Sequence, residues 1–404
     1  MTATPKPRSA PDDRELRLWK VGRTLLLAFA AAVLVAGGIF TALVVLLDFT
    51  TLDTGTKLDA KTLFDLVKLS FGVVAGAGAL VALVVAYRRQ RVDEAGAHRE
   101  STRLHTERFS QAVDKLGSPS PAVRLGGIHA LSGLADDAPR PELRQTCIDV
   151  LCAYLRLPYP PDPGNLPDLQ PDNTPHTEEQ REAHQAKQDR FRELREVRHT
   201  ILRLIADHYR LPAEDDRRSW QGYNLDLTGV TIDRPVNFGG ARFSGGIVNF
   251  GGARFSSGIV NFGGAEFSGG IVHFTGARFS SGIVHFGGAE FSGGIVNFGG
   301  ARFSGGTVNF TVAQFSGGTV NFEGAQFSGG TVHFSGARFS GGTVDFDGAR
   351  FSGSTVDFDG AGFSGGTVHF DRALGTVPLG LLGALGLPVP AMVALPSHWQ
   401  PGAP

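Results

Sequence analysis

The strongest constraint on the fold is a twelve-residue repeat between residues 238 and 370, for example FSGGIVNFGGARFSSGIVNFGG at residues 243–264. Two phenylalanine series interleave in it, beginning at Phe238 and Phe243, so that the rings are spaced alternately by five and seven residues. Valine stands two positions before each ring of the first series, and alanine before each ring of the second. The residue between is nearly always polar, and this alternation is typical of β-strands with one buried face.

The phenylalanines of both series are therefore expected to point inward and to pack on one another. We assign them a structural role, as the ladder that fills the interior of a repeat domain. The predicted ladder consists of Phe238, Phe243, Phe250, Phe255, Phe262, Phe267, Phe274, Phe279, Phe286, Phe291, Phe298, Phe303, Phe310, Phe315, Phe322, Phe327, Phe334, Phe339, Phe346, Phe351, Phe358, Phe363 and Phe370.

The repeat resembles that of the pentapeptide-repeat family. Its units Val-Asn-Phe-Gly-Gly and Ala-Arg-Phe-Ser-Gly are similar to the family's unit, in which a small and a polar residue precede Leu or Phe and two turn residues follow; the resemblance covers residues 225–371. The segments 107–156, 192–208 and 219–222 also resemble what precedes the repeats in membrane-anchored actinobacterial members. The resemblance implies a right-handed quadrilateral β-helix, a pentapeptide-repeat solenoid, over residues 220–371.

The sequence departs from the family's pattern because two residues, such as Gly246-Ile247, follow every second pentapeptide. Sides of five and seven residues would close a rectangular coil of 24 residues, so twelve copies predict about six coils. Ser-Gly-Gly-Thr between apolar residues also suits a two-residue hairpin turn, which stays open as an alternative. Hairpins would leave repeated strand edges to protect, and this favours the β-helix.

Two uncharged segments near the N-terminus predict transmembrane helices. Residues 24–47 and 69–87 provide 24 and 19 residues without a charge, against the about 20 that a spanning helix needs. A cleaved signal peptide is the alternative for the first segment, but its apolar core is shorter. The tail 1–23 and the residues after the second segment are rich in arginine, unlike the loop 48–68. These flanks predict a multi-pass plasma-membrane protein with an extracytoplasmic loop and both termini in the cytoplasm.

The remaining segments complete a multidomain prediction: two transmembrane helices, a small all-α region and a β-helix. Short apolar-periodic stretches in residues 88–157 indicate HEAT-like helices. The proline-rich residues 158–176 predict an exposed linker. A capping-box pattern, Thr177 with Gln180, begins an amphipathic helix at residues 177–211. Residues 372–404 are expected to cap the β-helix or to pair with another copy, with a third membrane span within them as an alternative.

Outward histidines and aspartates are the candidate metal ligands of the repeat. The histidines are irregularly distributed, whereas a zinc site needs close partners in fixed geometry. The aspartates could lie near one another on adjacent coils and bind a cation weakly, but a solvated face is the simpler interpretation. We therefore predict neither a metal site nor a cofactor. The residues concerned are His273, His285, His333, His369, Asp345, Asp347, Asp357 and Asp359.

No arrangement typical of catalysis is evident in the sequence, and we predict that the chain is not an enzyme. Glycine pairs such as Gly239-Gly240 lack the Lys-Ser/Thr ending of a phosphate loop. Cys147 and Cys152 have neither metal-ligand spacing nor a partner motif, which fits a reducing compartment.

The predicted function is a membrane-anchored, non-enzymatic scaffold that presents a rigid cytoplasmic β-helix for protein–protein interaction. Its expected partners are the lipid bilayer and an unknown protein, with homo-oligomers through the membrane helices or the C-terminal cap. Two alternatives are a DNA-mimic inhibitor or protector of a DNA-binding enzyme such as gyrase, and an accessory subunit of a membrane signalling or transport system. Residues 236–371 carry eight acids against six arginines, a near-neutral balance that argues against DNA mimicry. No nucleic-acid partner is expected.

Overall fold

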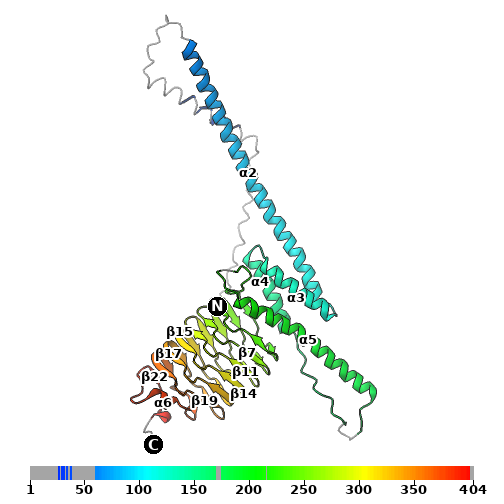
Figure 1. Ribbon diagram of the computed structural model, residues 1–404, viewed down its shortest axis with the longest axis vertical. Helices are drawn as coiled ribbons and strands as arrows, with labels where there is room; N and C mark the ends of the chain where they lie inside the picture. Colours follow the sequence, from blue (N-terminus) through cyan, green and yellow to red (C-terminus); the bar gives the residue numbers. More distant parts are fainter. Residues whose placement is uncertain are drawn as a thin grey trace, which may run out of the picture. The chain divides into compact units, whose positions relative to one another are not determined.

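A computed structural model describes residues 60–169, 174–214 and 216–400, with short helical pieces between residues 26 and 38. The chain divides into two compact units, Met1–Glu100 and Ser101–Pro404. The first element labelled in Figure 1 is helix α2, Ala60–Leu116, whose C-terminal end belongs to the second unit.

The prediction of two transmembrane helices is wrong for the part of the chain that the structure describes. No helix among these residues is long and apolar enough to cross a membrane. Most of residues 24–47 lie outside the described residues. Residues 69–87 belong to the long helix α2, and their uncharged run includes three glycines and five alanines, which contribute little apolar surface. The predicted multi-pass location in the plasma membrane therefore loses its support. The same holds for the predicted contact with the lipid bilayer and for the placement of both termini in the cytoplasm.

Three further helices form a small α region within the second unit. They are α3 (Pro121–Asp136), α4 (Pro141–Arg156) and α5 (Glu178–Arg210). Proline at the first position begins α3 and α4 without removing a needed hydrogen bond. Thr177 and Gln180 form a complete capping box at the start of α5. Apolar stripes of the three helices meet in one core that includes Ile128, Leu151 and Ile201.

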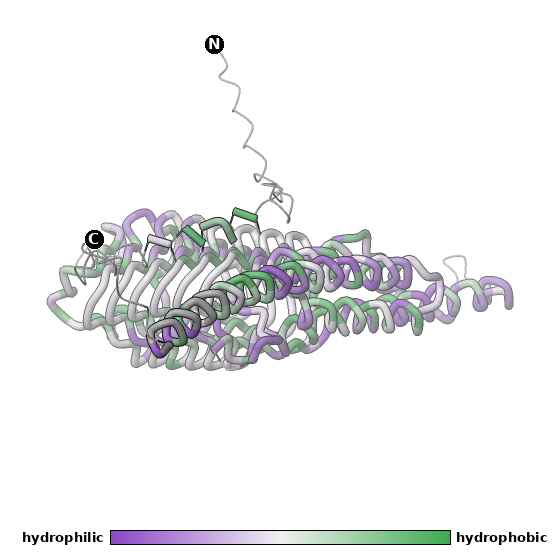
Figure 2. The backbone as a smooth tube through the Cα atoms, turned by 90° about the horizontal axis from the view of Figure 1, so that it is seen from above, coloured by the Kyte–Doolittle hydropathy of each residue, from purple (hydrophilic) through white to green (hydrophobic). Residues whose placement is uncertain are grey.

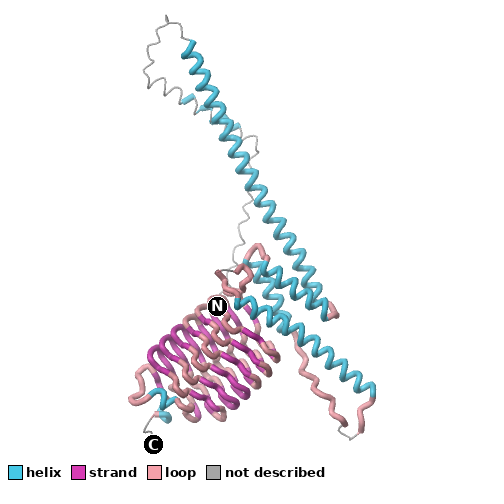
Figure 3. Tube along the Cα trace, in the orientation of Figure 1, coloured by secondary structure: helices cyan, strands magenta, loops and turns pink. Residues whose placement is uncertain are grey.

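The rest of the second unit is a β-solenoid of two eleven-stranded sheets (Figure 3). Sheet 1 consists of β1 (Leu225–Asp226), β4 (Arg242–Phe243), β5 (Ile247–Asn249), β8 (Glu266–Phe267), β9 (Ile271–His273), β12 (Glu290–Phe291), β13 (Ile295–Asn297), β15 (Gln314–Asn321), β17 (Arg338–Asp345), β20 (Gly362–His369) and β22 (Val393–Ala394). Sheet 2 consists of β2 (Thr231–Ile232), β3 (Val236–Asn237), β6 (Arg254–Phe255), β7 (Ile259–Asn261), β10 (Arg278–Phe279), β11 (Ile283–His285), β14 (Arg302–Asn309), β16 (Gln326–His333), β18 (Arg350–Phe351), β19 (Thr355–Asp357) and β21 (Leu374–Gly375).

Strand pairing is parallel throughout both sheets. Paired residues are 24 apart along most of the solenoid, 23 apart at β1 and β2, and 25 apart at β22. Val296, for example, lies beside Val272 on one side and Val320 on the other. Successive twelve-residue units alternate between the two sheets. Each full turn of the chain therefore adds one stretch of strand, which we call an arm, to sheet 1 and one to sheet 2. This parallel pairing excludes the hairpin alternative. The solenoid has about seven turns, more than the six expected, because pairing begins at Leu225 and continues to Ala394.

Phenylalanine rings stack along the interior with the same 24-residue step. The ring of Phe298 lies 4.8 Å from those of Phe274 and Phe322, with interplanar angles of 4°. Burying one such side chain contributes up to about 3 kcal/mol, and an aromatic pair adds about 1 kcal/mol. The stacked turns repeat the same hydropathy pattern along the solenoid (Figure 2). Because each ring is covered only by its neighbours, the turns stabilise one another.

Aromatic side chains also cover both ends of the stack. Tyr209 of α5 lies 5.3 Å from the ring of Phe243, and its hydroxyl donates to the carbonyl of Tyr223. At the other end, Trp399 in the 3-10 helix η1 (Ser397–Trp399) lies 5.5 Å from Phe351 and 5.8 Å from Phe370. With the short helix α6 (Leu381–Leu385), the C-terminal segment covers the last turn of the solenoid.

Two glycines test how closely the turns approach. Gly294 and Gly300 both adopt a left-handed backbone, with φ of +66° and +63°. A Cβ on Gly294 would lie 2.5 Å from the carbonyl oxygen of Gly270 on the preceding turn, whereas one on Gly300 would meet nothing within 4 Å. We expect Gly300→Ala to cost about 1 kcal/mol through backbone strain alone.

Gly294→Ala should cost about 3 kcal/mol or more, because the neighbouring turns must separate as well. Urea denaturation of the two full-length variants measures both losses. Equal losses would contradict the close stacking of the turns.

Candidate functional site

The predicted interior ladder lies inside the solenoid and offers no reactive group to solvent. All its phenylalanines are buried except Phe363, which is partly buried on the last complete turn. These rings therefore position the outward side chains, and any site for a partner must be sought on the outer surface or at the junction with the helices.

The outward histidines lie in two separate columns, where a column is the set of equivalent side chains on successive turns. His273 and His369 belong to sheet 1, and His285 and His333 belong to sheet 2. Asn309 lies between His285 and His333, so these two rings are two turns apart. Within the described ranges, the structure contains no group of three or more side chains that could hold a metal ion.

The four outward aspartates do not form one cluster. Asp345 ends a strand of sheet 1, and Asp357 ends a strand of sheet 2, so the two pairs lie at different corners. Arg372 pairs with Asp347 and lowers the pKa of its carboxyl. The Asp357 carboxylate accepts a hydrogen bond from Ser335 at 2.7 Å. The structure therefore does not place the two pairs together on adjacent coils, the arrangement that the alternative of a weakly bound cation required.

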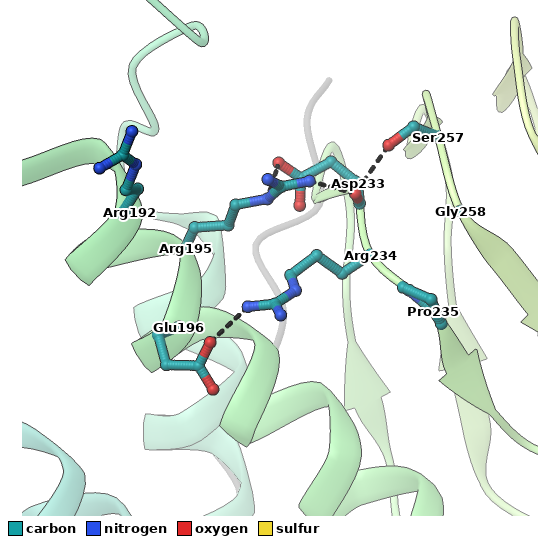
Figure 4. Close-up of a pocket in the computed structure, with 8 residues that line it drawn as sticks. All are labelled: Arg192, Arg195, Glu196, Asp233, Arg234, Pro235, Ser257 and Gly258. Atoms are coloured by element: carbon teal, nitrogen blue, oxygen red, sulfur yellow. Dashed lines mark hydrogen bonds and ion pairs between the residues drawn. The ribbon is translucent and has the colours of Figure 1, made fainter. Parts of the chain in front are cut away.

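A groove of about 520 Å³ separates α5 from the first turns of the solenoid (Figure 4). Arg195 Nε lies 3.2 Å from the Asp233 carboxylate, and Arg234 pairs with Glu196. Arg192, at the rim, pairs with Asp189 on its own helix. Since each arginine has an acidic partner, the groove is electrically balanced. The Arg195–Asp233 and Arg234–Glu196 pairs attach α5 to the solenoid.

A buried aromatic and ionic cluster joins the helices to the beginning of the solenoid. His208 of α5 stacks on Trp220 with ring centroids 4.2 Å apart. Trp220 Nε1 donates to one oxygen of Asp136 at 3.1 Å, and His208 Nε2 lies 3.3 Å from the other. His208 Nδ1 lies 2.6 Å from the Leu204 carbonyl oxygen, which can only accept. Both ring nitrogens thus face acceptors, an arrangement that favours the protonated imidazolium.

The pKa of His208 is raised above its ordinary value. Burial by itself lowers this pKa, but the hydrogen bonds to the Asp136 carboxylate and the Leu204 carbonyl raise it further than burial lowers it. The sequence gives no local signal for this pair, because Asp136 lies on another helix, 72 residues away from His208.

The two cysteines are buried in the helical core and remain free. Burial raises the pKa of the Cys147 thiol to about 11 and that of Cys152 to about 12. Thiols with such pKa values are almost wholly protonated near neutral pH and are weak nucleophiles.

The 24-residue turn separates charges that alternate along the sequence. On sheet 2, the residue directly before each ring of the second phenylalanine series is an arginine on three successive turns. These residues are Arg254, Arg278 and Arg302. All three side chains are exposed, and their guanidinium groups form no ion pair or hydrogen bond with any described residue. We call these three residues the arginine column.

The equivalent position on sheet 1 carries Glu266 and Glu290 on successive turns, which we call the glutamate column. Glu266 lies 3.2 Å from Arg242 on the preceding turn. Counting acids and arginines along the sequence gave a near-neutral surface, and it missed this separation because neighbouring units lie on different sheets. The signal was present as the alternation of Arg and Glu at residues 254, 266, 278, 290 and 302.

Isoleucine side chains run beside both charged columns on the same turns. Ile247 and Ile295 on sheet 1 are 45% and 41% exposed, and Ile259 and Ile283 on sheet 2 are 49% and 37% exposed. Threonine replaces isoleucine at these positions from residue 307 onward. The N-terminal half of the solenoid therefore exposes an apolar column beside a charged one on each sheet.

Comparison of the chain with protein-family models, with curated proteins and with solved structures finds no match in any of the three.

The His208 cluster predicts a pH-dependent stability. Because the pKa of His208 is higher in the folded state than its unfolded value of 6.5, its contribution is complete below that value. The contribution is lost as the pH rises through the folded pKa. The free energy of unfolding of the full chain should therefore contain a component that falls over the pH range above about 6.5.

His208→Gln should remove this component and cost about 2 kcal/mol at the acidic end of the range. Urea denaturation at a series of pH values tests it, with His273→Gln on the solenoid surface as the control. An unchanged pH profile in His208→Gln would contradict the assigned charge.

Proposed function

We propose that this chain is a non-enzymatic scaffold of the pentapeptide-repeat type, which presents ordered columns of side chains to a protein partner. The single observation that carries the proposal is the parallel stack, in which each outward position recurs one strand spacing, about 4.8 Å, above the last. A repeat architecture of this kind provides an extended and rigid recognition surface.

The chemistry of the outer surface supports binding rather than catalysis. The groove beside α5 has its arginines paired, and the free thiols have raised pKa values. Exposed aliphatic columns beside unpaired guanidinium groups suit a protein partner, because the buried core of a protein interface is apolar and arginine is enriched in it.

Imitation of DNA fits the surface less well than a scaffold does. A mimic of the duplex must present closely spaced negative charge. The arginine column gives sheet 2 the opposite sign over three successive turns, and sheet 1 mixes glutamates with Arg242 and Arg338.

A face-specific crosslinking experiment tests the scaffold. A photo-crosslinking residue replaces Ser280 on sheet 2 or Ser292 on sheet 1, both exposed and equivalent in the repeat. In cells that express the full-length protein, we expect each position to give its own defined set of protein adducts, because the two faces carry different charges. Adducts that are absent at both positions, or no different from those of a position in the buried ladder, would contradict a role in recognition.

A further inference from the structure

We propose that the solenoid associates laterally with a second copy of itself, the arginine column of one copy binding the glutamate column of another. This inference rests on the proposed scaffold function and names one partner for it. The inference starts from the repulsion between like charges within each column. Like charges directly opposite one another on neighbouring strands destabilise a sheet. A partner of opposite charge would relieve this repulsion on both columns at once.

The spacing of the charges selects the partner. Arg254, Arg278 and Arg302 recur on adjacent parallel strands, hence at the strand spacing of about 4.8 Å. Alternate side chains of an extended acidic peptide are about 6.6 Å apart, and the phosphates of one DNA strand rise by about 3.4 Å each. Another parallel β-stack has the same period as the arginine column. Glu266 and Glu290 of this chain are adjacent acids on such a stack.

The apolar columns match in the same arrangement. Ile283 follows Arg278 by five residues on sheet 2, and Ile295 follows Glu290 by five residues on sheet 1. When the two faces meet, arginine can therefore oppose glutamate while isoleucine opposes isoleucine. Seen from outside, every face of the solenoid has the same handed relation between the direction of its strands and the direction in which successive turns are added. When two such faces meet with their strands running the same way, the turns of the two copies are added in opposite directions. This match therefore requires the two solenoid axes to be antiparallel.

The antiparallel arrangement fixes the register of the contact. Arg278 of one copy then faces Glu290 of the other, and Arg302 faces Glu266. Arg254 faces Gln314, an uncharged residue that can still accept a hydrogen bond. Glu266 already lies near Arg242 of its own chain, but exposed pairs of this kind contribute little and leave carboxylate oxygen available. No like charges oppose one another within this overlap.

The area of the contact indicates a weak, concentration-dependent association. An arm of eight residues is about 26 Å long and four turns are about 19 Å tall, so each face offers about 500 Å². Two faces together bury roughly 1,000 Å², the lower end for specific complexes. The contact joins two different faces of the molecule, and such contacts propagate unless they close. Species larger than dimers are therefore expected, and added salt should weaken them.

Complementary charge reversal tests the contact on the full-length protein by sedimentation velocity. One variant carries Arg278→Glu with Arg302→Glu, and the other carries Glu266→Arg with Glu290→Arg. Wild type should form larger species as its concentration rises, and each variant alone should lose them because like charges then meet. An equimolar mixture of the two variants should regain them, since each face again finds its opposite. Far-ultraviolet dichroism verifies that both variants remain folded.

A matched control changes the same charge outside the contact. Arg350→Glu alters the equivalent position of sheet 2 on a later turn, beyond the antiparallel overlap, and should leave self-association unchanged. Three results would overturn the inference: wild type that stays monomeric at every concentration, a mixture that fails to regain the larger species, or a control that loses them.

Wild type that stays monomeric but binds a labelled single-stranded oligonucleotide through the arginine column would also overturn the inference, in favour of a nucleic-acid partner. Loss of self-association with retained face-specific protein adducts would remove this partner and leave the scaffold function standing.

Discussion

Ring-on-ring contact along the solenoid axis is the interaction on which the rest of the second unit depends. Each phenylalanine is covered by the equivalent rings of the turns before and after it, at centroid distances near that of Phe298 to Phe322, 4.8 Å. A single turn would leave its four rings exposed, so no turn is stable without neighbours. This explains why both ends need an aromatic cover, supplied by Tyr209 and by Trp399.

The same stack turns a nearly uniform sequence into a patterned surface. Because one turn contains two units, residues twelve apart in sequence lie on different sheets, and residues 24 apart become neighbours. The alternation of Arg and Glu from Arg254 to Arg302 is thereby sorted into a basic column and an acidic column. Net charge conceals this sorting, and the outer chemistry becomes visible only when the sequence is written in lines of 24.

The sequence pattern predicted the features that depend on neighbouring residues. It did not predict the features that depend on contacts between residues far apart in the sequence. The alternation around each phenylalanine indicated the inward side chains, and Thr177 with Gln180 indicated the start of α5. Distant contacts escaped: Asp136 beside His208, and the extra turn completed by β22. The absence of charge from residues 69–87 predicted a span, although no described helix is long and apolar enough to cross a membrane.

The central claim, parallel pairing between residues 24 apart, is tested most directly by engineered disulfides. Asn297 and Asn321 are partners on adjacent strands of sheet 1, whereas Asn309, twelve residues from each, belongs to sheet 2. Adjacent parallel strands lie about 4.8 Å apart, within the range that a disulfide can bridge. Asn297→Cys with Asn321→Cys should crosslink under mild oxidation, and Asn297→Cys with Asn309→Cys should not. Crosslinking of the second pair in preference to the first would contradict the solenoid.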